Sequence, residues 1–356
     1  MMKGLKKWRL FSLLTVMTVF LSACGEEYIS TLRPSGPVGK EQLNILILAS
    51  VIMLFVVIIV STIYLVAFFK FRRSKVGENH MPKQVEGSHT LEVIWTVIPI
   101  VLLLILAVPT LNSTYKFADV AAMDEVDENG NKTALTINVT AKLYWWEFEY
   151  PDLGIITAQD LVVPTGEKVY FNLLAADVKH SFWIPAVGGK MDTNVDGINK
   201  FYLQFDKKSE GLNDGEGVFY GKCAELCGPS HALMDFKVKA LDREGFDAWV
   251  AAMKATEGNT ANKESADIGE ATFANSCLGC HAVSAVAGSG LGPNLTNFGD
   301  RARLAGFMEH TVENTTEWII DPDKYKPGNT MKGTYNVSPE EAKAIAEYLM
   351  TLSVEQ

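Results

Sequence analysis

Two long uncharged apolar stretches constrain this chain more than any other feature. Gln42 to Phe69 carries no charged residue over 28 positions, and Val93 to Tyr115 carries none over 23. About 20 apolar residues are enough to cross the hydrocarbon core of a bilayer. A pair of buried core helices is the soluble alternative. We expect a membrane hairpin with spans at about 42–69 and 93–115, in which Pro99 and Pro109 are tolerated.

The segment between the two spans is basic and predicts their orientation. Lys70-Phe71-Arg72-Arg73-Ser74-Lys75 stands in a short loop, and such loops face the cytoplasm. The N-terminus and the C-terminal part of the chain then lie outside. Glu92 opens the second span on the cytoplasmic side. An acid at the mouth of a span is either an interfacial carboxylate or the start of a proton path.

The N-terminus has the pattern of an export signal. Lys3, Lys6, Lys7 and Arg9 precede an apolar run from Leu10 to Leu21, which is too short to span a bilayer. Leu21-Ser22-Ala23-Cys24 resembles a bacterial lipobox. This resemblance implies a signal peptide over residues 1–23 and a lipid on Cys24. A plain signal peptide with a chance cysteine is the alternative.

Beyond the hairpin the composition is that of soluble globular protein. The chain has 32 basic and 42 acidic residues, a net charge of −10, which argues against a nucleic-acid partner. Residues 116–133 are polar and predict a loop. From Leu135 to Val139 apolar and polar residues alternate, and an aromatic strand follows at Tyr144–Tyr150. Further short strand patterns stand at 160–163, 168–174 and 200–205, so we expect a β-sandwich or barrel.

One short run carries metal chemistry. Cys223-Ala224-Glu225-Leu226-Cys227-Gly228-Pro229-Ser230-His231-Ala232-Leu233-Met234 holds two thiols, an imidazole and a thioether, and His180 stands upstream. Soft sulfur ligands with imidazole favour copper, whereas zinc does not normally use Met. A mononuclear blue-copper site needs one Cys; two suit a pair of copper ions that share both sulfurs. A thioredoxin-like copper-delivery protein is the alternative.

This run resembles the dinuclear CuA centre of cytochrome c oxidase subunit II. The family pattern is a His followed by C-x-E-x-C-x3-H-x2-M, and the resemblance covers roughly residues 41–240, implying a cupredoxin-like sandwich over 117–252. The implied copper ligands are His180, Cys223, the backbone carbonyl of Glu225, Cys227, His231 and Met234.

The same resemblance implies roles for residues outside the copper ligands. The Glu225 side chain would face a magnesium ion at the junction with the catalytic subunit, near Asp192. Glu92 matches the carboxylate at the entrance of the family's proton channel. Tyr144, Trp145 and Trp146 match the aromatic patch through which electrons arrive, although Tyr144 stands where many members carry Trp.

The C-terminal part carries a haem-attachment pattern. Cys277-Leu278-Gly279-Cys280-His281 lets both thiols bond to the haem while His281 binds the iron. A zinc site or a redox dithiol is the alternative. Helices are expected at 267–275 and at 339–352, the latter capped by Ser338. Residues 253–264 are polar and predict a linker. Since each of the five cysteines has a chemical role of its own, no disulfide is expected.

Residues 265–356 resemble small cytochromes c. That family places a Met in a loop about fifty residues after the His, and Met331 fits this position; His310 is its main rival. Met308 and Met350 fit helical core positions better. The domain holds 12 acidic and six basic residues, which could steer a basic electron donor or serve solubility alone.

The whole chain resembles subunit II of caa-type oxidases from Gram-positive and related bacteria. It is then a multidomain membrane protein: a two-helix transmembrane hairpin, an all-β cupredoxin-like sandwich and an all-α cytochrome c domain. The resemblance implies that an external donor, cytochrome c or a reductase complex, feeds haem c, then CuA, then subunit I, where O2 is reduced with proton translocation. Subunit III is a further implied partner. A nitric oxide reductase subunit and a stand-alone carrier are alternatives; quinol oxidase subunit II lacks the copper ligands.

Overall fold

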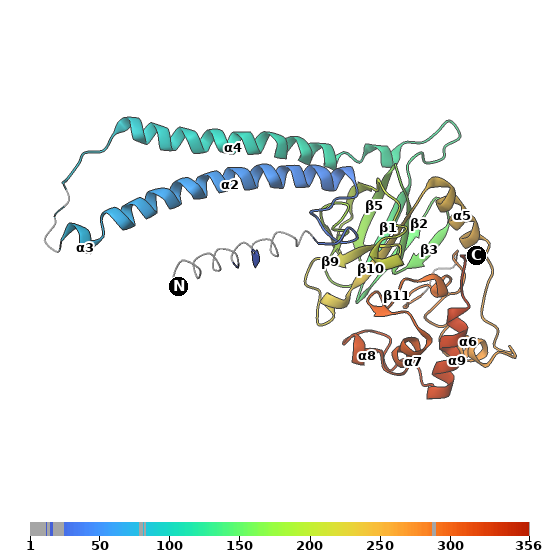
Figure 1. Cartoon of the computed structure of the whole chain (residues 1–356). Helices are drawn as coiled ribbons and strands as arrows, with labels where there is room; N and C mark the ends of the chain where they lie inside the picture. Colours follow the sequence, from blue (N-terminus) through green and yellow to red (C-terminus); the bar gives the residue numbers. More distant parts are fainter. Residues whose placement is uncertain are drawn as a thin grey trace. The chain divides into compact units, whose positions relative to one another are not determined.

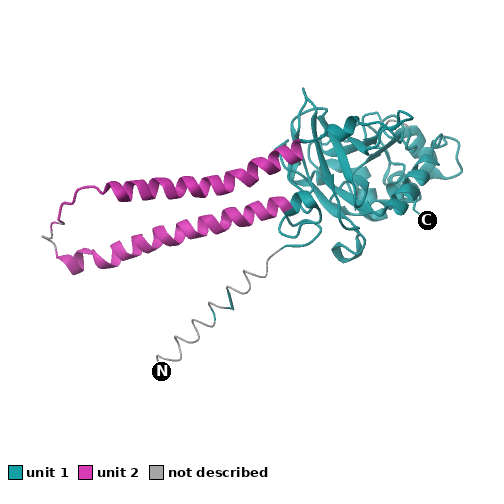
Figure 2. Cartoon of the chain, turned by 90° about the horizontal axis from the view of Figure 1, so that it is seen from above, with its two compact units in different colours: residues 1–40, 119–356 teal, residues 41–118 magenta. Residues whose placement is uncertain are grey.

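The computed structural model describes residues 12, 15, 16, 25–77, 81, 83–286 and 290–355. They divide into two compact units, one of residues 41–118 and the other of residues 1–40 and 119–356 (Figure 2). Cys24, the predicted site of lipidation, lies outside the described residues.

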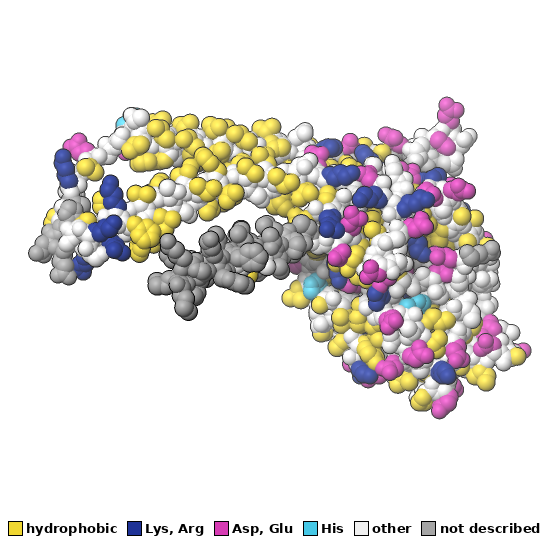
Figure 3. All heavy atoms as spheres, viewed as in Figure 1, with side chains coloured by type: hydrophobic (Ala, Val, Ile, Leu, Met, Phe, Trp, Pro, Cys, Tyr) yellow, Lys and Arg dark blue, Asp and Glu magenta, His cyan; other side chains and the backbone are white. Residues whose placement is uncertain are grey.

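The smaller unit is built from two long helices. α2 runs over Pro37–Lys70 and α4 over His89–Ala118, with the short α3 (Arg73–Val76) following α2. Both long helices are apolar enough to cross a membrane, and hydrophobic side chains cover them in Figure 3. At one end the Glu41 carboxylate accepts from Ser113 Oγ (2.6 Å) and Lys116 Nζ (2.8 Å), which ties the helices together.

Two five-stranded sheets form a sandwich in the larger unit (Figure 1). The first has the order β3-β2-β1-β5-β8 and the second β4-β10-β9-β6-β7. Both are mixed, because β1 pairs with β5, and β10 with β4, in parallel. The strands are β1 Thr136–Lys142, β2 Trp145–Tyr150, β3 Ile155–Ala158, β4 Asp160–Pro164, β5 Lys168–Ala175, β6 His180–Trp183, β7 Met191–Thr193, β8 Asn199–Gln204, β9 Phe219–Cys223 and β10 Asp235–Leu241.

Aromatic side chains fill the space between the sheets. The rings of Phe182 and Phe236 stack with centroids 4.8 Å apart, and Trp146 packs edge-on against Phe182 at 5.6 Å. All three are fully buried. Each such ring contributes about 2–3 kcal/mol by leaving water, so this cluster makes a rigid base for the end of the sandwich that carries His180 and Cys223.

The C-terminal part is mostly helical. α6 and α7 pack against α9 around a core that includes Phe273, Ile345 and Leu349. Ser338 caps α9 in a reciprocal capping box with Glu341, which is the start expected from the sequence. The elements are α5 Arg243–Lys254, α6 Ile268–Ser276, β11 Arg303–Leu304, β12 Met308–Glu309, α7 Val312–Ile320, α8 Pro322–Tyr325 and α9 Pro339–Met350, with 3-10 turns at Ala121–Asp124, Asn213–Gly215, His231–Leu233 and Phe298–Asp300.

Most residues of the segment expected to be a linker are exposed, but Met253, Thr256 and Ala261 are buried and anchor it. α5 continues to Lys254, and Met253 is fully buried. Ala261 belongs to the hydrophobic core of the cytochrome part, and Thr256 Oγ1 accepts from Ala285 N at 2.9 Å. The polar composition of residues 253–264 therefore reflects exposed positions between these anchors. The sandwich and the cytochrome part accordingly belong to one compact unit.

Candidate metal and haem sites

The copper-type motif forms a closed loop between β9 and β10. Cys223 ends β9, and its backbone N–H donates to Met234 O at 3.2 Å across the mouth of the loop. Gly228 has φ +135°, and a Cβ there would lie 2.5 Å from Tyr144 Oη. The loop therefore needs glycine at this position, because a side chain would displace the tyrosine.

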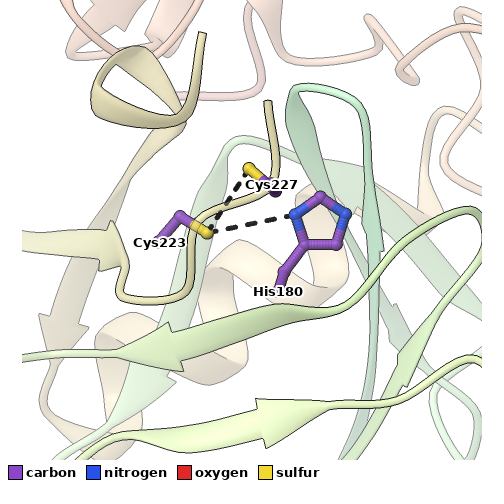
Figure 4. A group of neighbouring side chains, drawn as sticks. All are labelled: His180, Cys223 and Cys227. Carbon is purple, nitrogen blue, oxygen red and sulfur yellow. Dashed lines mark hydrogen bonds between the residues drawn. The ribbon is translucent and has the colours of Figure 1, made fainter. Parts of the chain in front are cut away.

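The donor atoms converge inside this loop. Cys223 Sγ lies 3.9 Å from both Cys227 Sγ and His180 Nδ1, as Figure 4 shows. Cys227 Sγ is 3.6 Å from His231 Nδ1 and 3.9 Å from Met234 Sδ. The carbonyl oxygen of Glu225 lies 3.3 Å from Cys223 Sγ. The structure thus brings together all six predicted copper-site residues.

A second layer of contacts orients the donors. The fully buried His180 has its Nε2 2.8 Å from Asp177 Oδ1, which turns Nδ1 toward the sulfurs. Trp146 Nε1 donates to Met234 O at 3.3 Å. Burial, and then the neighbouring Cys223, raise the pKa of the Cys227 thiol to about 12. A metal that binds here must displace the thiol proton, so its binding is coupled to proton release.

The donor set fits copper. Two thiols, two imidazoles and a thioether are the soft and intermediate ligands that copper prefers, whereas closed zinc sites use four Cys or His ligands. Two thiols 3.9 Å apart suit two metal ions that share both sulfurs, and they distinguish the loop from a mononuclear site with a single Cys.

The two carboxylates expected near magnesium are also neighbours. Lys190 Nζ lies 3.6 Å from both Asp192 Oδ1 and Glu225 Oε2. Lys179 Nζ is 2.8 Å from Asp192 Oδ2 and lowers the pKa of that carboxyl. The Lys190 ammonium therefore lies between the two carboxylates, where a divalent cation would bind.

A separate cavity of about 370 Å³ surrounds the haem-attachment motif. Cys277, Cys280, His281 and Met331 all line it, in largely apolar company that includes Trp318 and Leu295. The four predicted haem contacts therefore face one space. Its apolar walls and paired thiols fit a covalently held porphyrin.

His281 is held in the form that an iron ligand needs. Its Nδ1 lies 2.7 Å from Pro293 O, so the neutral ring donates there and leaves Nε2 free to bind a metal. Burial lowers the pKa of this imidazole, which favours the neutral ring. A Cβ on Gly292 would lie 2.6 Å from His281 Cε1, so glycine allows the chain to pass close to the ring.

Met331 and His310, the two main candidates for the sixth iron ligand, lie in different surroundings. Met331 lines the cavity, and its N–H donates to Asn329 Oδ1 at 3.0 Å within a tight loop. His310 is not among the described residues that line the cavity; its Nδ1 lies 2.8 Å from Arg301 O, and its ring packs on Phe298. Met308 and Met350 pack against the helical core.

The aromatic patch divides between two environments. Tyr144 and Trp145 line the haem cavity and are 4% and 8% exposed. Trp146 points into the sandwich core and is fully buried.

In the other unit, Glu92 stands in the first turn of α4, with His89 Nδ1 3.8 Å from its carboxylate.

Two residues at these sites were not predicted from the sequence. Asp177 stands three positions before His180, and Lys326 immediately precedes the loop of Met331. Short-range spacing could have indicated Asp177, because a carboxylate often supports a ligating histidine. Lys326 gives no such indication, since its partners, Tyr144 O and Ala305 O, are distant in sequence.

A membrane hairpin, a copper-type donor loop on a β-sandwich and a haem-attachment motif define a membrane-bound electron-transfer protein. Three family models match the chain: cytochrome c oxidase subunit II, transmembrane domain, at residues 35–112; its periplasmic domain at residues 155–241; and cytochrome c at residues 266–353. The chain belongs to the cytochrome c oxidase subunit II family, in the form that carries a C-terminal cytochrome c domain.

Relatives match over nearly the whole chain. Cytochrome c oxidase subunit 2 of Bacillus sp. (strain PS3) is 56% identical, with all of both chains covered, and that of Bacillus subtilis (strain 168) is 50% identical, covering 98% of this chain and 99% of its own. Quinol oxidase subunit 2 of Bacillus cereus is 31% identical over 70% of this chain and 81% of its own. Among solved structures, the periplasmic domain of cytochrome oxidase subunit II from Bradyrhizobium japonicum is 30% identical, covering 33% of this chain and 91% of its own, with a TM-score of 0.30.

Proposed function

We propose that the chain is the electron-input subunit of a respiratory oxidase, which receives electrons at a haem c and passes them through a dinuclear copper centre to subunit I. The buried convergence of His180, Cys223 and Cys227, with donor atoms all within 4.8 Å of one another, carries this proposal. Copper and haem iron supply reversible one-electron chemistry when bound.

Each part of the chain contributes by holding its group in place. Cys277 and Cys280 would anchor the porphyrin, and His281 and Met331 would bind its iron. The two thiols of Cys223 and Cys227 would hold the copper pair, together with His180, His231, Met234 and the Glu225 carbonyl. Two thiols held by two metals in common would spread the charge, so an added electron would alter each bond little, which favours electron transfer over chemistry at the metal.

Several finer assignments belong to the same proposal. The Glu225 side chain faces a magnesium ion at the subunit I junction, near Asp192. Glu92 begins a proton path, Cys24 carries a lipid, and the domains after the hairpin lie on the outer face. The donor is cytochrome c or a reductase complex, and subunit III completes the assembly.

The alternatives differ in acceptor or in partner. A nitric oxide reductase subunit would use a similar copper loop, and a stand-alone carrier would need no partner subunit. The full-length likeness to oxidase subunits favours oxygen reduction in the partner subunit. The copper donors and the haem motif of this chain favour electron input from a cytochrome over quinol oxidation.

Metal analysis joined to electron paramagnetic resonance tests the proposal on the full chain. We expect two copper ions and one haem per chain, with hyperfine structure from two equivalent copper nuclei. Cys227→Ser should abolish that pattern, whereas Ser209→Ala, a buried change elsewhere in the sandwich, should leave it intact. A spectrum of one localised copper would overturn the proposal. Consumption of oxygen or of nitric oxide by the purified complex distinguishes the two candidate terminal acceptors.

A further inference from the structure

The loop that carries Met331 touches the loop that carries the copper donors. Ser230 Oγ donates to Pro327 O at 2.7 Å, and Ser230 is fully buried. Ser230 immediately precedes His231, while Pro327 stands four residues before Met331. The two candidate metal sites are therefore joined by one hydrogen bond between segments 97 residues apart.

A buried lysine makes a second connection at the same place. Lys326 Nζ donates to Tyr144 O and to Ala305 O, each at 2.8 Å, and the residue is 3% exposed. Tyr144 belongs to the sandwich and Ala305 to the cytochrome part. An ammonium or amine buried this deeply is tolerated only while it keeps its acceptors, so one side chain ties both parts to a single position.

Close packing surrounds these two bonds. Gly328 has φ +79°, and a Cβ there would lie 3.4 Å from Pro229 Cγ and 3.5 Å from Tyr144 Oη. Tyr144 Oη in turn lies 2.5 Å from the Cβ position of Gly228. The tyrosine ring therefore sits between the glycine of one loop and the glycine of the other, where little space remains.

Contacts outside the loops hold the two parts more coarsely. Lys237 Nζ donates to Gly306 O at 2.7 Å, and Ala302 N donates to Asp160 Oδ2 at 3.1 Å. These bonds involve neither metal-site loop. They keep the cytochrome part on the sandwich, while Ser230 and Lys326 set where the haem loop rests on the copper loop.

We propose that Ser230 and Lys326 are positioning residues for the haem-to-copper electron step: they fix the Met331 loop against the His231 loop, so the step occurs in a pre-formed contact rather than by encounter of tethered domains. This inference rests on the proposed function. In the step one electron leaves the ferrous iron, which becomes ferric, and reduces the oxidised copper pair by one electron; no proton is transferred.

The test uses the full chain loaded with copper and haem. A photoexcited ruthenium complex reduces the haem, and the rate of copper reduction is followed at increasing solvent viscosity. We expect a viscosity-independent rate in the wild type. Ser230→Ala should slow the step about fivefold and Lys326→Met about tenfold or more, and both rates should now fall with viscosity, because the loops must first meet. Ser209→Ala and the exposed Lys343→Met are the matched controls.

Two further readouts separate positioning from damage. The haem absorption spectrum and the copper resonance should be unchanged in the variants, and amide hydrogen exchange of residues 326–331 should rise. If the Lys326→Met variant loses its haem, the transfer rate of Ser230→Ala and its dependence on viscosity test the positioning role alone.

Unchanged, viscosity-independent transfer in Ser230→Ala and in a well-folded Lys326→Met would overturn the positioning role and leave the proposed function standing. Absence of any haem-to-copper transfer in the wild type would instead overturn the proposed function.

Discussion

Asp177 Oδ1 lies 2.8 Å from Nε2 of the fully buried His180, and the opposite nitrogen of that ring faces Cys223 Sγ at 3.9 Å. The carboxylate also accepts from Leu143 N at 2.7 Å, so it is itself held in place. One acid therefore orients a metal donor and ties it to the segment that leads into Tyr144.

Asp177→Asn should weaken copper binding about 10- to 100-fold, because the amide is a poorer partner for the ligating imidazole. Competition titration of the full chain with a copper chelator measures the change. Asp196→Asn, on an exposed loop of the same domain, should bind as the wild type does. Equal affinities in the two variants would mean that Asp177 does not support the site.

Met331→Ala should convert the haem from a low-spin to a high-spin spectrum and lower its reduction potential, because the iron loses a thioether ligand. Optical spectra and a redox titration of the full chain measure both effects. Met308→Leu and His310→Gln serve as comparisons, since these residues lie outside the described lining of the cavity. A low-spin spectrum that survives in Met331→Ala but disappears in His310→Gln would reassign the ligand.

Gly292→Ala should reduce haem incorporation or lower the unfolding temperature by several degrees. The new methyl group would stand 2.6 Å from His281 Cε1, so the ring or the chain must move. The haem-to-protein ratio and calorimetry check this. Gly290→Ala, whose Cβ would meet nothing nearer than 3.8 Å, should behave as the wild type. Normal haem content and stability in Gly292→Ala would show that the loop adjusts freely.

Stability should rise with pH between about 7 and 8.5. Burial lowers the pKa of Lys326 to about 7 and that of Lys237 to about 8, from an ordinary value of 10.5. Within this window the unfolded chain binds more protons at these lysines than the folded chain does, so raising the pH favours the folded state, by at most about 1.4 kcal/mol per pH unit for each group.

Denaturant unfolding of the full chain at several pH values and constant ionic strength measures this slope. The slope should be smaller in Lys326→Met, which removes one of the titrating groups, and unaltered in Lys343→Met. Stability that falls with pH in the wild type over this range would contradict the assignment of buried, proton-releasing lysines.

Local patterns made much of the architecture predictable. The two helices at Pro37–Lys70 and His89–Ala118 contain the expected spans, because a long run without charges has few other solutions. The expected strands at 160–163, 168–174 and 200–205 correspond to β4, β5 and β8 within a residue or two. The strands β3, β6, β7, β9 and β10 were not predicted. Of these, β6 and β7 have only four and three residues, too few to show alternation.

The chemistry of both sites follows from the spacing of their residues along the chain. Cys223, Cys227, His231 and Met234 stand within one loop, and Cys277, Cys280 and His281 within another, so their spacing alone limits what they can bind. Tertiary structure alone decided how the sites meet. Tyr144 and Trp145 line the haem cavity, and Lys326 and Ser230 join its loop to the copper loop. These contacts link residues that are about 100 to 180 positions apart and depend on buried hydrogen bonds to backbone carbonyls, which any residue supplies and no sequence pattern records.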